Sequence, residues 1–219
     1  MMKFKAAIFD LDGTLLNTLQ DIADSMNEVL KNNGFPQHEA EAYKLFVGEG
    51  MRTLVRKVLP EKERVDTVIE KCLSEMRRTY GSGWAEKTRP YDGIESMLKW
   101  LKENGLRLSV LSNKPHEFTL KSIRHFFEES IFEIVLGAGK FPDKPDPASA
   151  IYISEQMGIP PSQFIYLGDS GIDMATATGA GMFAVGVLWG FRGREELTLS
   201  GANLLVSSPG ELIEFLENS

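Results

Sequence analysis

Four aspartates follow two short apolar runs of the chain. Asp10 and Asp12 come directly after the first run, and Asp169 and Asp173 follow a later one. Two carboxylates about 4 Å apart repel each other by roughly 4 kcal/mol at an effective dielectric near 20, so a cluster of them needs a cation. Oxygen ligands of this kind suit Mg²⁺, which accepts few carboxylates and keeps several waters. The sequence therefore predicts an Mg²⁺ site held mainly by Asp10 and Asp169.

The spacing of Asp10 and Asp12 suits phosphoryl transfer. Residues i and i+2 of an extended segment point the same way, so both carboxylates can address one reacting centre. One carboxylate can attack phosphorus as a nucleophile, as in enzymes that form an aspartyl-phosphate. The other can protonate the leaving oxygen and then activate water. The pair alone does not decide which aspartate has which role.

Four further residues are placed to bind a phosphate group. Gly13 and Thr14 turn the chain after the paired aspartates, and their backbone amides can hold a phosphate oxygen. Ser112 follows another apolar run, and Lys144 precedes a proline after the next run. A hydroxyl and an ammonium at these places can hold the equatorial oxygens while charge is redistributed in the transition state.

The elements that must position these residues are short apolar runs, each of which ends at a polar turn. Runs of this shape are typical of buried strands. From residue 91 onward they alternate with helical patterns, which predicts an α/β fold with a doubly wound parallel sheet covered on both faces. Ligands of such sheets lie beyond the carboxyl ends of the strands, where the polar residues stand. The runs are Phe4–Phe9, Leu106–Leu111, Ile131–Leu136, Phe164–Leu167, Met182–Val187 and Leu204–Val206.

Residues 17–88 interrupt this alternation with amphipathic helical patterns and no clear strand. We therefore predict a catalytic core of residues 1–16 and 89–219 and an inserted helical cap of residues 17–88. Gly81, Gly83 and Pro90 mark the expected return to the core.

One loop of this cap, residues 47–52, is expected to enter the site. Gly50 lets the backbone approach a ligand closely. Arg52 can bind a second anionic group of the ligand, such as a carboxylate, because a guanidinium contacts a carboxylate through two hydrogen bonds. The alternative is that Arg52 lies on the solvated face of a cap helix.

Composition limits the classes of protein that fit. The chain has 219 residues, 42% of them hydrophobic, and a formal net charge of −7, most of it on the predicted core. That charge argues against a general nucleic-acid binder. No apolar run is long enough to cross a membrane, and Asp10 and Asp12 interrupt the early run that a signal peptide would need. We expect a cytoplasmic monomer or homodimer that acts on a small molecule.

Four motifs in order resemble those of the haloacid dehalogenase superfamily. The resemblance covers essentially the whole chain and implies an α/β core with a cap. Lys114 adjoins the second motif and is expected to point away from the site. The motifs are Phe9-Asp10-Leu11-Asp12-Gly13-Thr14-Leu15, Ser112-Asn113-Lys114, Lys144-Pro145-Asp146-Pro147, and Gly168-Asp169-Ser170 with Asp173.

The resemblance also implies a role for each motif residue. Asp10 would be the nucleophile and Asp12 the general acid and base. Mg²⁺ would be held by the Asp10 carboxylate, the backbone carbonyl of Asp12 and Asp169, and Asp173 would orient the metal site or Lys144. Asn113 of the second motif is expected to take part in substrate binding.

The branch of the superfamily follows from two features. The dehalogenases lack the second aspartate of the first motif, so Asp12 favours phosphoryl chemistry. The helical insertion is similar to the cap of the phosphoglycolate phosphatase-like branch, which implies a small phosphomonoester substrate and favours phosphoglycolate. Similar caps serve pyrophosphatases, sugar-phosphate phosphatases and phosphoglucomutases, and these alternatives remain open. A phospho-accepting signalling domain is disfavoured, because it needs neither Asp12 nor a cap. A non-catalytic binding protein is disfavoured as well, because it has no need of the complete set of polar groups.

Overall fold

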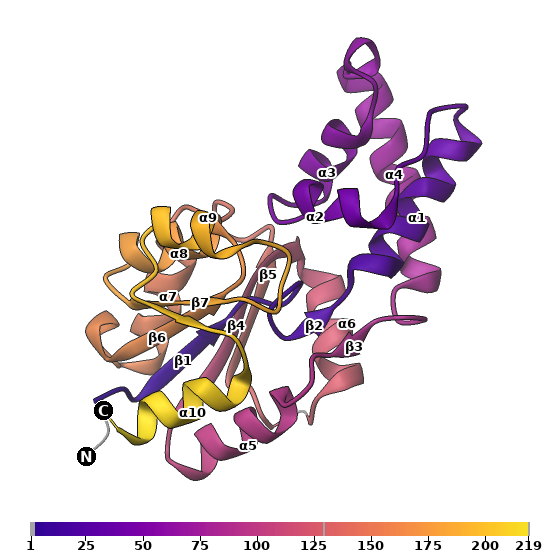
Figure 1. Cartoon of the computed structure of the whole chain (residues 1–219). Coiled ribbons are helices and arrows are strands. Elements are labelled where there is room, and N and C mark those ends of the chain that lie inside the picture. The colour runs from indigo at the N-terminus through magenta and orange to yellow at the C-terminus, as the bar shows by residue number, and fades with distance from the viewer. Residues whose placement is uncertain (1–2, 129, 219) are drawn as a thin grey trace.

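The computed structural model describes residues 3–128 and 130–218, which form an α/β core and a helical extension above it (Figure 1). Within these residues, six parallel strands form one sheet in the order β5-β4-β1-β6-β7-β8. The doubly wound parallel fold predicted from the sequence is confirmed. The strands are β1 (Ala6–Phe9), β4 (Arg107–Pro115), β5 (Ile134–Ala138), β6 (Phe164–Gly168), β7 (Phe183–Val187) and β8 (Leu204–Val206).

Helices cover both faces of the sheet, which explains why its central strands β1 and β6 are apolar throughout. Alternate residues of β1 belong to different hydrophobic clusters, with Ala7 and Phe9 in one and Ala6 and Ile8 in the other. The first cluster includes side chains of α5 (Ile94–Glu103), α6 (His116–Phe126) and α10 (Pro209–Glu217). The second includes side chains of α7 (Ala148–Met157), α8 (Gly171–Gly179) and α9 (Arg194–Leu199).

The helical extension has a hydrophobic cluster of its own. Its helices are α1 (Leu19–Asn32), α2 (Tyr43–Phe46), α3 (Met51–Val58) and α4 (Asp66–Gly83), with 3-10 turns at Ala40–Ala42 and Glu61–Glu63. Cys72 and Met76 of α4 pack in this cluster, together with Phe118 and Phe191 from the core. The two core phenylalanines therefore join the extension to the sheet domain.

A small antiparallel ribbon connects the two parts. β2 (Leu16–Asn17) pairs with β3 (Arg89–Pro90). Next to the ribbon, the buried carboxylate of Asp21 accepts hydrogen bonds from the backbone amides of Lys87 and Thr88 and from the Thr88 hydroxyl. The ribbon supports the proposed division into a core (1–16 and 89–219) and a cap (17–88), which stays a prediction.

The expected position of the return to the core needs a correction. Gly81 and Gly83 lie within the last turns of α4, and only Pro90 lies in the connection. A helical glycine costs only about 1 kcal/mol relative to alanine, and Tyr80, which is fully buried, packs edge-on against Phe118 of the core. The last turns of α4 therefore lie against the core and remain helical.

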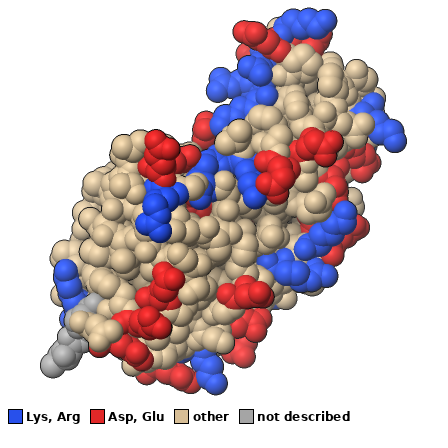
Figure 2. Space-filling view, viewed as in Figure 1, with Lys and Arg blue, Asp and Glu red and all other residues tan. Residues whose placement is uncertain are grey.

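Charge is distributed unevenly over the molecule. On the face drawn in Figure 2, acidic and basic side chains are interspersed over the helical extension, while acidic side chains gather on the lower part of the core. Among the described residues no helix is both long enough and apolar enough to cross a membrane.

Candidate active site

The predicted site residues converge at the carboxyl ends of the central strands. Asp10 follows β1, Ser112 lies in the last part of β4, and Asp169 follows β6. Lys144 comes from the loop between β5 and α7. All four are buried, with 2–7% of their surface exposed. Polar side chains so deeply buried need partners. Ser112 Oγ accepts a hydrogen bond from the backbone amide of Lys114 at 3.2 Å, and the partners of the other three follow.

Lys144 joins two of the aspartates. Its Nζ donates to Asp10 Oδ1 and to Asp173 Oδ1, both at 2.7 Å, and to the backbone carbonyl of Leu111 at 3.2 Å. Burial disfavours the ammonium, but Asp10 and Asp173 outweigh that effect and raise the pKa of Lys144 well above its ordinary value. The Lys144 ammonium thus lies behind Asp10, between Asp10 and Asp173.

Asp173 is held in place by the start of α8. Its Oδ2 accepts hydrogen bonds from the Ser170 hydroxyl at 2.6 Å and from the Ser170 backbone amide at 3.2 Å, in a capping box. With Oδ2 engaged by Ser170, Oδ1 is directed at Lys144. The structure thus places Asp173 where it can orient Lys144.

Three carboxylates, those of Asp10, Asp169 and Asp173, have oxygen atoms within 4.8 Å of one another. Burial raises the pKa of Asp10 to about 7, against the opposing effect of Lys144. Burial, together with Asp10 and Asp173, raises the pKa of Asp169 well above its ordinary value. Three buried carboxylates share one ammonium, so the cluster lacks positive charge. A divalent cation with a preference for oxygen ligands fits both this charge and this donor set.

Gly13 and Gly190 pack so closely against Asp169 that neither position has room for a side chain. A Cβ atom added to Gly13 would lie 2.2 Å from Asp169 Oδ2, and one added to Gly190 would lie 2.3 Å from Asp169 Cβ. The backbone of Gly13 also has a φ of +91°, which other residues rarely adopt. The backbone amide of Phe191 donates to Asp169 Oδ2 at 2.6 Å. The Asp169 carboxylate is therefore held in one position between two loops.

The turn predicted to bind phosphate lies beside these aspartates. Thr14 is buried, and its hydroxyl has no hydrogen-bond partner among the described residues. Its carbonyl accepts a hydrogen bond from Trp189 Nε1 at 2.9 Å, which fixes the turn. The backbone amides of Gly13 and Thr14 donate to the carbonyls of Leu16 at 2.8 Å and Leu11 at 3.3 Å, so the structure does not leave them free for a phosphate oxygen as the sequence predicts.

Asn113 connects the site to the cap. Its Nδ2 donates to the carbonyls of Gly48 and Lys144, and its Oδ1 accepts from the backbone amide of Lys144. Arg192 Nη2 also donates from the core to the carbonyl of Val47. Asn113 thus holds the cap loop and the Lys144 loop together, a contact that the sequence did not indicate.

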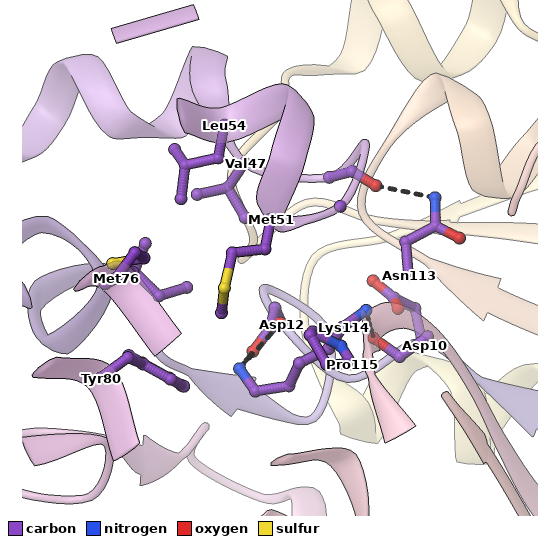
Figure 3. A pocket seen from close by; sticks show the side chains of 14 residues that line it. Asp10, Asp12, Val47, Met51, Leu54, Met76, Tyr80, Asn113, Lys114 and Pro115 are labelled. Atoms are coloured by element: carbon purple, nitrogen blue, oxygen red, sulfur yellow. Dashed lines mark hydrogen bonds and ion pairs between the residues drawn. The ribbon is translucent and has the colours of Figure 1, made fainter. Parts of the chain in front are cut away.

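A cavity lies between the cap and the ends of β1 and β4 (Figure 3). Its upper wall is apolar and comes from the cap, and its floor carries the polar groups of the core. Gly50 lines this cavity, as expected for a loop that enters the site. The fourteen lining residues are Asp10, Asp12, Ile22, Val47, Gly48, Gly50, Met51, Leu54, Met76, Tyr80, Ser112, Asn113, Lys114 and Pro115.

Arg52 does not line this cavity. Its guanidinium is half exposed and forms ion pairs with Asp66 at 2.9 Å and Glu70 at 3.0 Å, both on α4. Arg52 lines a separate surface groove that includes Gly50, Arg77 and Asn113. The expectation that Arg52 binds an anionic group of the substrate stays a prediction, and in this structure two cap carboxylates take up that charge.

The expectation that Lys114 points away from the site is wrong. Its Nζ contacts Asp12 Oδ1 at 2.8 Å and Oδ2 at 3.1 Å, and it lies 4.7 Å from the centre of the Tyr80 ring. Strand β4 continues through Pro115, so Ser112 and Lys114 are two residues apart on an extended segment and face the same side. The spacing of two residues that places Asp10 and Asp12 on one side of the chain thus also places Lys114 on the same side as Ser112.

Removal and return of a divalent cation give a first prediction. Adding MgCl₂ to metal-stripped protein at about 100 times Kd is expected to stabilise the fold by about 2.7 kcal/mol and to raise the melting temperature by roughly 5–10 °C. Scanning calorimetry measures the shift. Asp169→Asn should abolish it, and Asp92→Asn, which alters an exposed aspartate before α5, should leave it unchanged. An equal shift in Asp169→Asn would exclude this cluster as the metal site.

Comparisons with known proteins agree with this geometry. The family model described as haloacid dehalogenase-like hydrolase matches residues 7–187. The chain is 33% identical over 191 residues to the phosphoglycolate phosphatase of Psychrobacter arcticus, covering 84% of this chain and 83% of the relative. It is 29% identical over 221 residues to the phosphoglycolate phosphatase of Haemophilus influenzae, covering 98% and 99%. A crystal structure from Lactobacillus delbrueckii subsp. bulgaricus, provisionally named a phosphoglycolate phosphatase, superposes with a TM-score of 0.92 at 30% identity, covering 98% of this chain and 99% of that one.

Proposed function

The chain belongs to the haloacid dehalogenase-like hydrolase family, and we propose that it hydrolyses 2-phosphoglycolate through an aspartyl-phosphate formed on Asp10, with Mg²⁺ as its metal. One observation carries the proposal. The buried Asp10 carboxylate, held by Lys144, lies with Asp12 on the floor of a cavity beneath the cap. Relatives named phosphoglycolate phosphatase support the substrate, since they match most of the chain.

In the first step Asp10 acts as the nucleophile. Lys144 engages Oδ1 of Asp10, and the other carboxylate oxygen is used for the attack on phosphorus. A bond forms between this oxygen and phosphorus while the bond from phosphorus to the ester oxygen breaks. Asp12 gives its proton to the leaving oxygen, so glycolate leaves as an alcohol and Asp12 becomes a carboxylate.

In the second step the phosphoryl group passes to water. The Asp12 carboxylate takes a proton from a water molecule as the water oxygen attacks phosphorus. The bond from phosphorus to Asp10 breaks, which restores the Asp10 carboxylate and releases inorganic phosphate. Asp12 ends the cycle protonated; it gives up this proton when it pairs with Lys114 in the free protein and takes one up again as the next substrate binds.

Fixed positive charge and hydrogen-bond donors favour the transition states of both steps. Lys144 and the hydroxyl of Ser112 are proposed to hold equatorial oxygens of the transferring group. Asp10, Asp169 and the Asp12 carbonyl are proposed to hold the Mg²⁺, which when bound offsets the phosphate charge. Asp173 keeps Lys144 directed at Asp10.

The cap is proposed to exclude water while the phosphoryl group is transferred. The carbonyls of Val47 and Gly48 accept hydrogen bonds from Arg192 and Asn113 of the core, so the cap loop is fastened over the cavity. Exclusion of bulk water strengthens electrostatic interactions inside a site. We also propose that the protein is cytoplasmic and a monomer or homodimer. Gel filtration with light scattering tests the oligomeric state.

A substrate panel tests the proposed function. Purified protein with Mg²⁺ is expected to release phosphate from 2-phosphoglycolate with a kcat/KM at least about tenfold above that for pyrophosphate or sugar phosphates, a margin of about 1.4 kcal/mol. EDTA and Asp10→Asn should remove this activity. A preference for pyrophosphate or a sugar phosphate would keep the mechanism and overturn the substrate. Conversion of a sugar phosphate to its isomer would indicate a mutase.

A further inference from the structure

Lys114 is the basic residue of the cavity. Of the fourteen described residues that line it, no other has a Lys or Arg side chain. Lys144 lies behind Asp10, outside the lining, and Arg52 is paired on the cap surface. An anionic group that enters the cavity beside the phosphate therefore meets one ammonium.

The surroundings of Lys114 hold its ammonium inside the cavity. Its side chain is 4% exposed, and the Asp12 carboxylate and the Tyr80 ring lie next to Nζ. In Figure 3 the side chain extends along Asp12 toward Tyr80, below the end of Met51. An ammonium has three donors, so Lys114 can contact both Asp12 and a second acceptor.

Apart from the hydroxyl of Tyr80, which is uncharged and has no partner among the described residues, the rest of the upper wall offers an anion no side-chain donor. The side chains that form it, which have no hydrogen-bond donor, are Ile22, Val47, Met51, Leu54 and Met76. The Asn113 amide, which is the other side-chain N–H group in the lining, already donates to the carbonyls of Gly48 and Lys144. Burying a charged group against such a wall is costly unless it is paired, so an anionic leaving group is directed to Lys114.

We propose that Lys114 is the specificity-determining residue for the leaving group and binds its carboxylate. The inference rests on the proposed function, because Asp12 as general acid must face the ester oxygen. Lys114 contacts both oxygens of Asp12, so a group attached to the ester oxygen lies next to its ammonium. In phosphoglycolate one carbon separates that oxygen from the carboxylate. Leaving groups with a carboxylate this close are preferred to neutral ones of the same size.

Two substrates of equal length and different charge test the proposal: 2-phosphoglycolate and the neutral-ended 2-hydroxyethyl phosphate. Lys114→Met keeps the length of the side chain and removes its charge. It is expected to reduce the ratio of kcat/KM for the two substrates by roughly 10- to 100-fold, the usual effect of one charged hydrogen bond. Lys114→Arg should retain part of the ratio. Lys99→Met, on the exposed face of α5, should leave it unchanged.

The ratio separates substrate recognition from a purely structural role. If Lys114→Met lowers both values of kcat/KM by the same factor, Lys114 only positions Asp12 and the inference is overturned. Circular dichroism and the melting temperature establish that each variant is folded. A variant that does not fold is replaced by Lys114→Gln, which is judged by the same ratio.

Binding measurements separate this inference from the proposed function. Calorimetry on the Asp10→Asn protein with Mg²⁺ gives Kd for both compounds, and the same measurement is repeated after Lys114→Met is added to that protein. Tighter binding of phosphoglycolate that is lost with Lys114→Met supports the inference, even if the wild-type protein hydrolyses other phosphates better. Affinities that do not change on Lys114→Met overturn it, whatever the turnover.

Discussion

Replacing Asp10 by asparagine is expected to lower kcat for phosphoglycolate by at least about 10⁴-fold, as losses of catalytic nucleophiles do. The amide has nearly the shape of the carboxylate but cannot form the acyl-phosphate. It can still accept a hydrogen bond from Lys144, whose Nζ lies 2.7 Å from Asp10 Oδ1. The fold should therefore persist while turnover disappears. Steady-state release of phosphate in the presence of Mg²⁺ measures the effect.

The matched control for Asp10→Asn is Asp92→Asn, the same change at an exposed position before α5. It should keep the kcat of the wild-type protein within a factor of about two, since surface substitutions away from special features have small effects. Asp10→Asn with turnover similar to that of the wild type would remove Asp10 as the nucleophile. Another buried aspartate of the cluster, Asp169, would then be examined for that role.

Replacing Asp12 by asparagine is expected to lower kcat by roughly 10²- to 10⁴-fold, the usual contribution of a general acid or base. Both steps suffer, because an amide neither protonates the leaving oxygen nor accepts a proton from water. The loss should be smaller in the first step for p-nitrophenyl phosphate, whose leaving group needs no proton. With that substrate, rapid-quench measurements should show a burst of nitrophenol followed by slow turnover. An equal loss in both steps would contradict the assignment of Asp12.

Asp12→Asn also affects stability. It leaves the buried Lys114 ammonium, 4% exposed, without its anionic partner. Breaking a buried ion pair typically costs about 3–5 kcal/mol, and an amide oxygen that accepts one hydrogen bond reduces that cost. Kinetic measurements on this variant therefore belong well below its melting temperature.

The fold was predictable because local pattern and tertiary environment agree. The central strands β1 and β6 are buried along their whole length, and their sequences are continuously apolar. The polar residues that end β1 and β6, Asp10 and Asp169, could be placed at one sheet edge by the rule for parallel strands alone. Their positions can be predicted without any knowledge of side-chain contacts.

The cap residues were harder, because their contacts come from distant parts of the chain. The role expected of Arg52 came from its loop, but its partners Asp66 and Glu70 lie on another helix, and nothing in residues 47–52 indicates them.

The direction of the Lys114 side chain does not follow from the apolar run, which predicts a strand that ends near residue 111, whereas β4 extends to Pro115. Four more residues of strand turn its side chain into the cavity. The length of a strand depends on its neighbours, here the pairing of Pro115 with Ala138 of β5.

The covalent phosphoenzyme is the centre of this account, and its direct detection is the sharpest test. Asp12→Asn is mixed with p-nitrophenyl phosphate and Mg²⁺, quenched in acid within the burst, digested and analysed by tandem mass spectrometry. We predict that the peptide containing Asp10 carries the mass of one phosphoryl group, localised to Asp10, and that the same peptide from Asp10→Asn carries none. A phosphoryl group on a different residue, or a complete burst with no modified peptide, would contradict the mechanism.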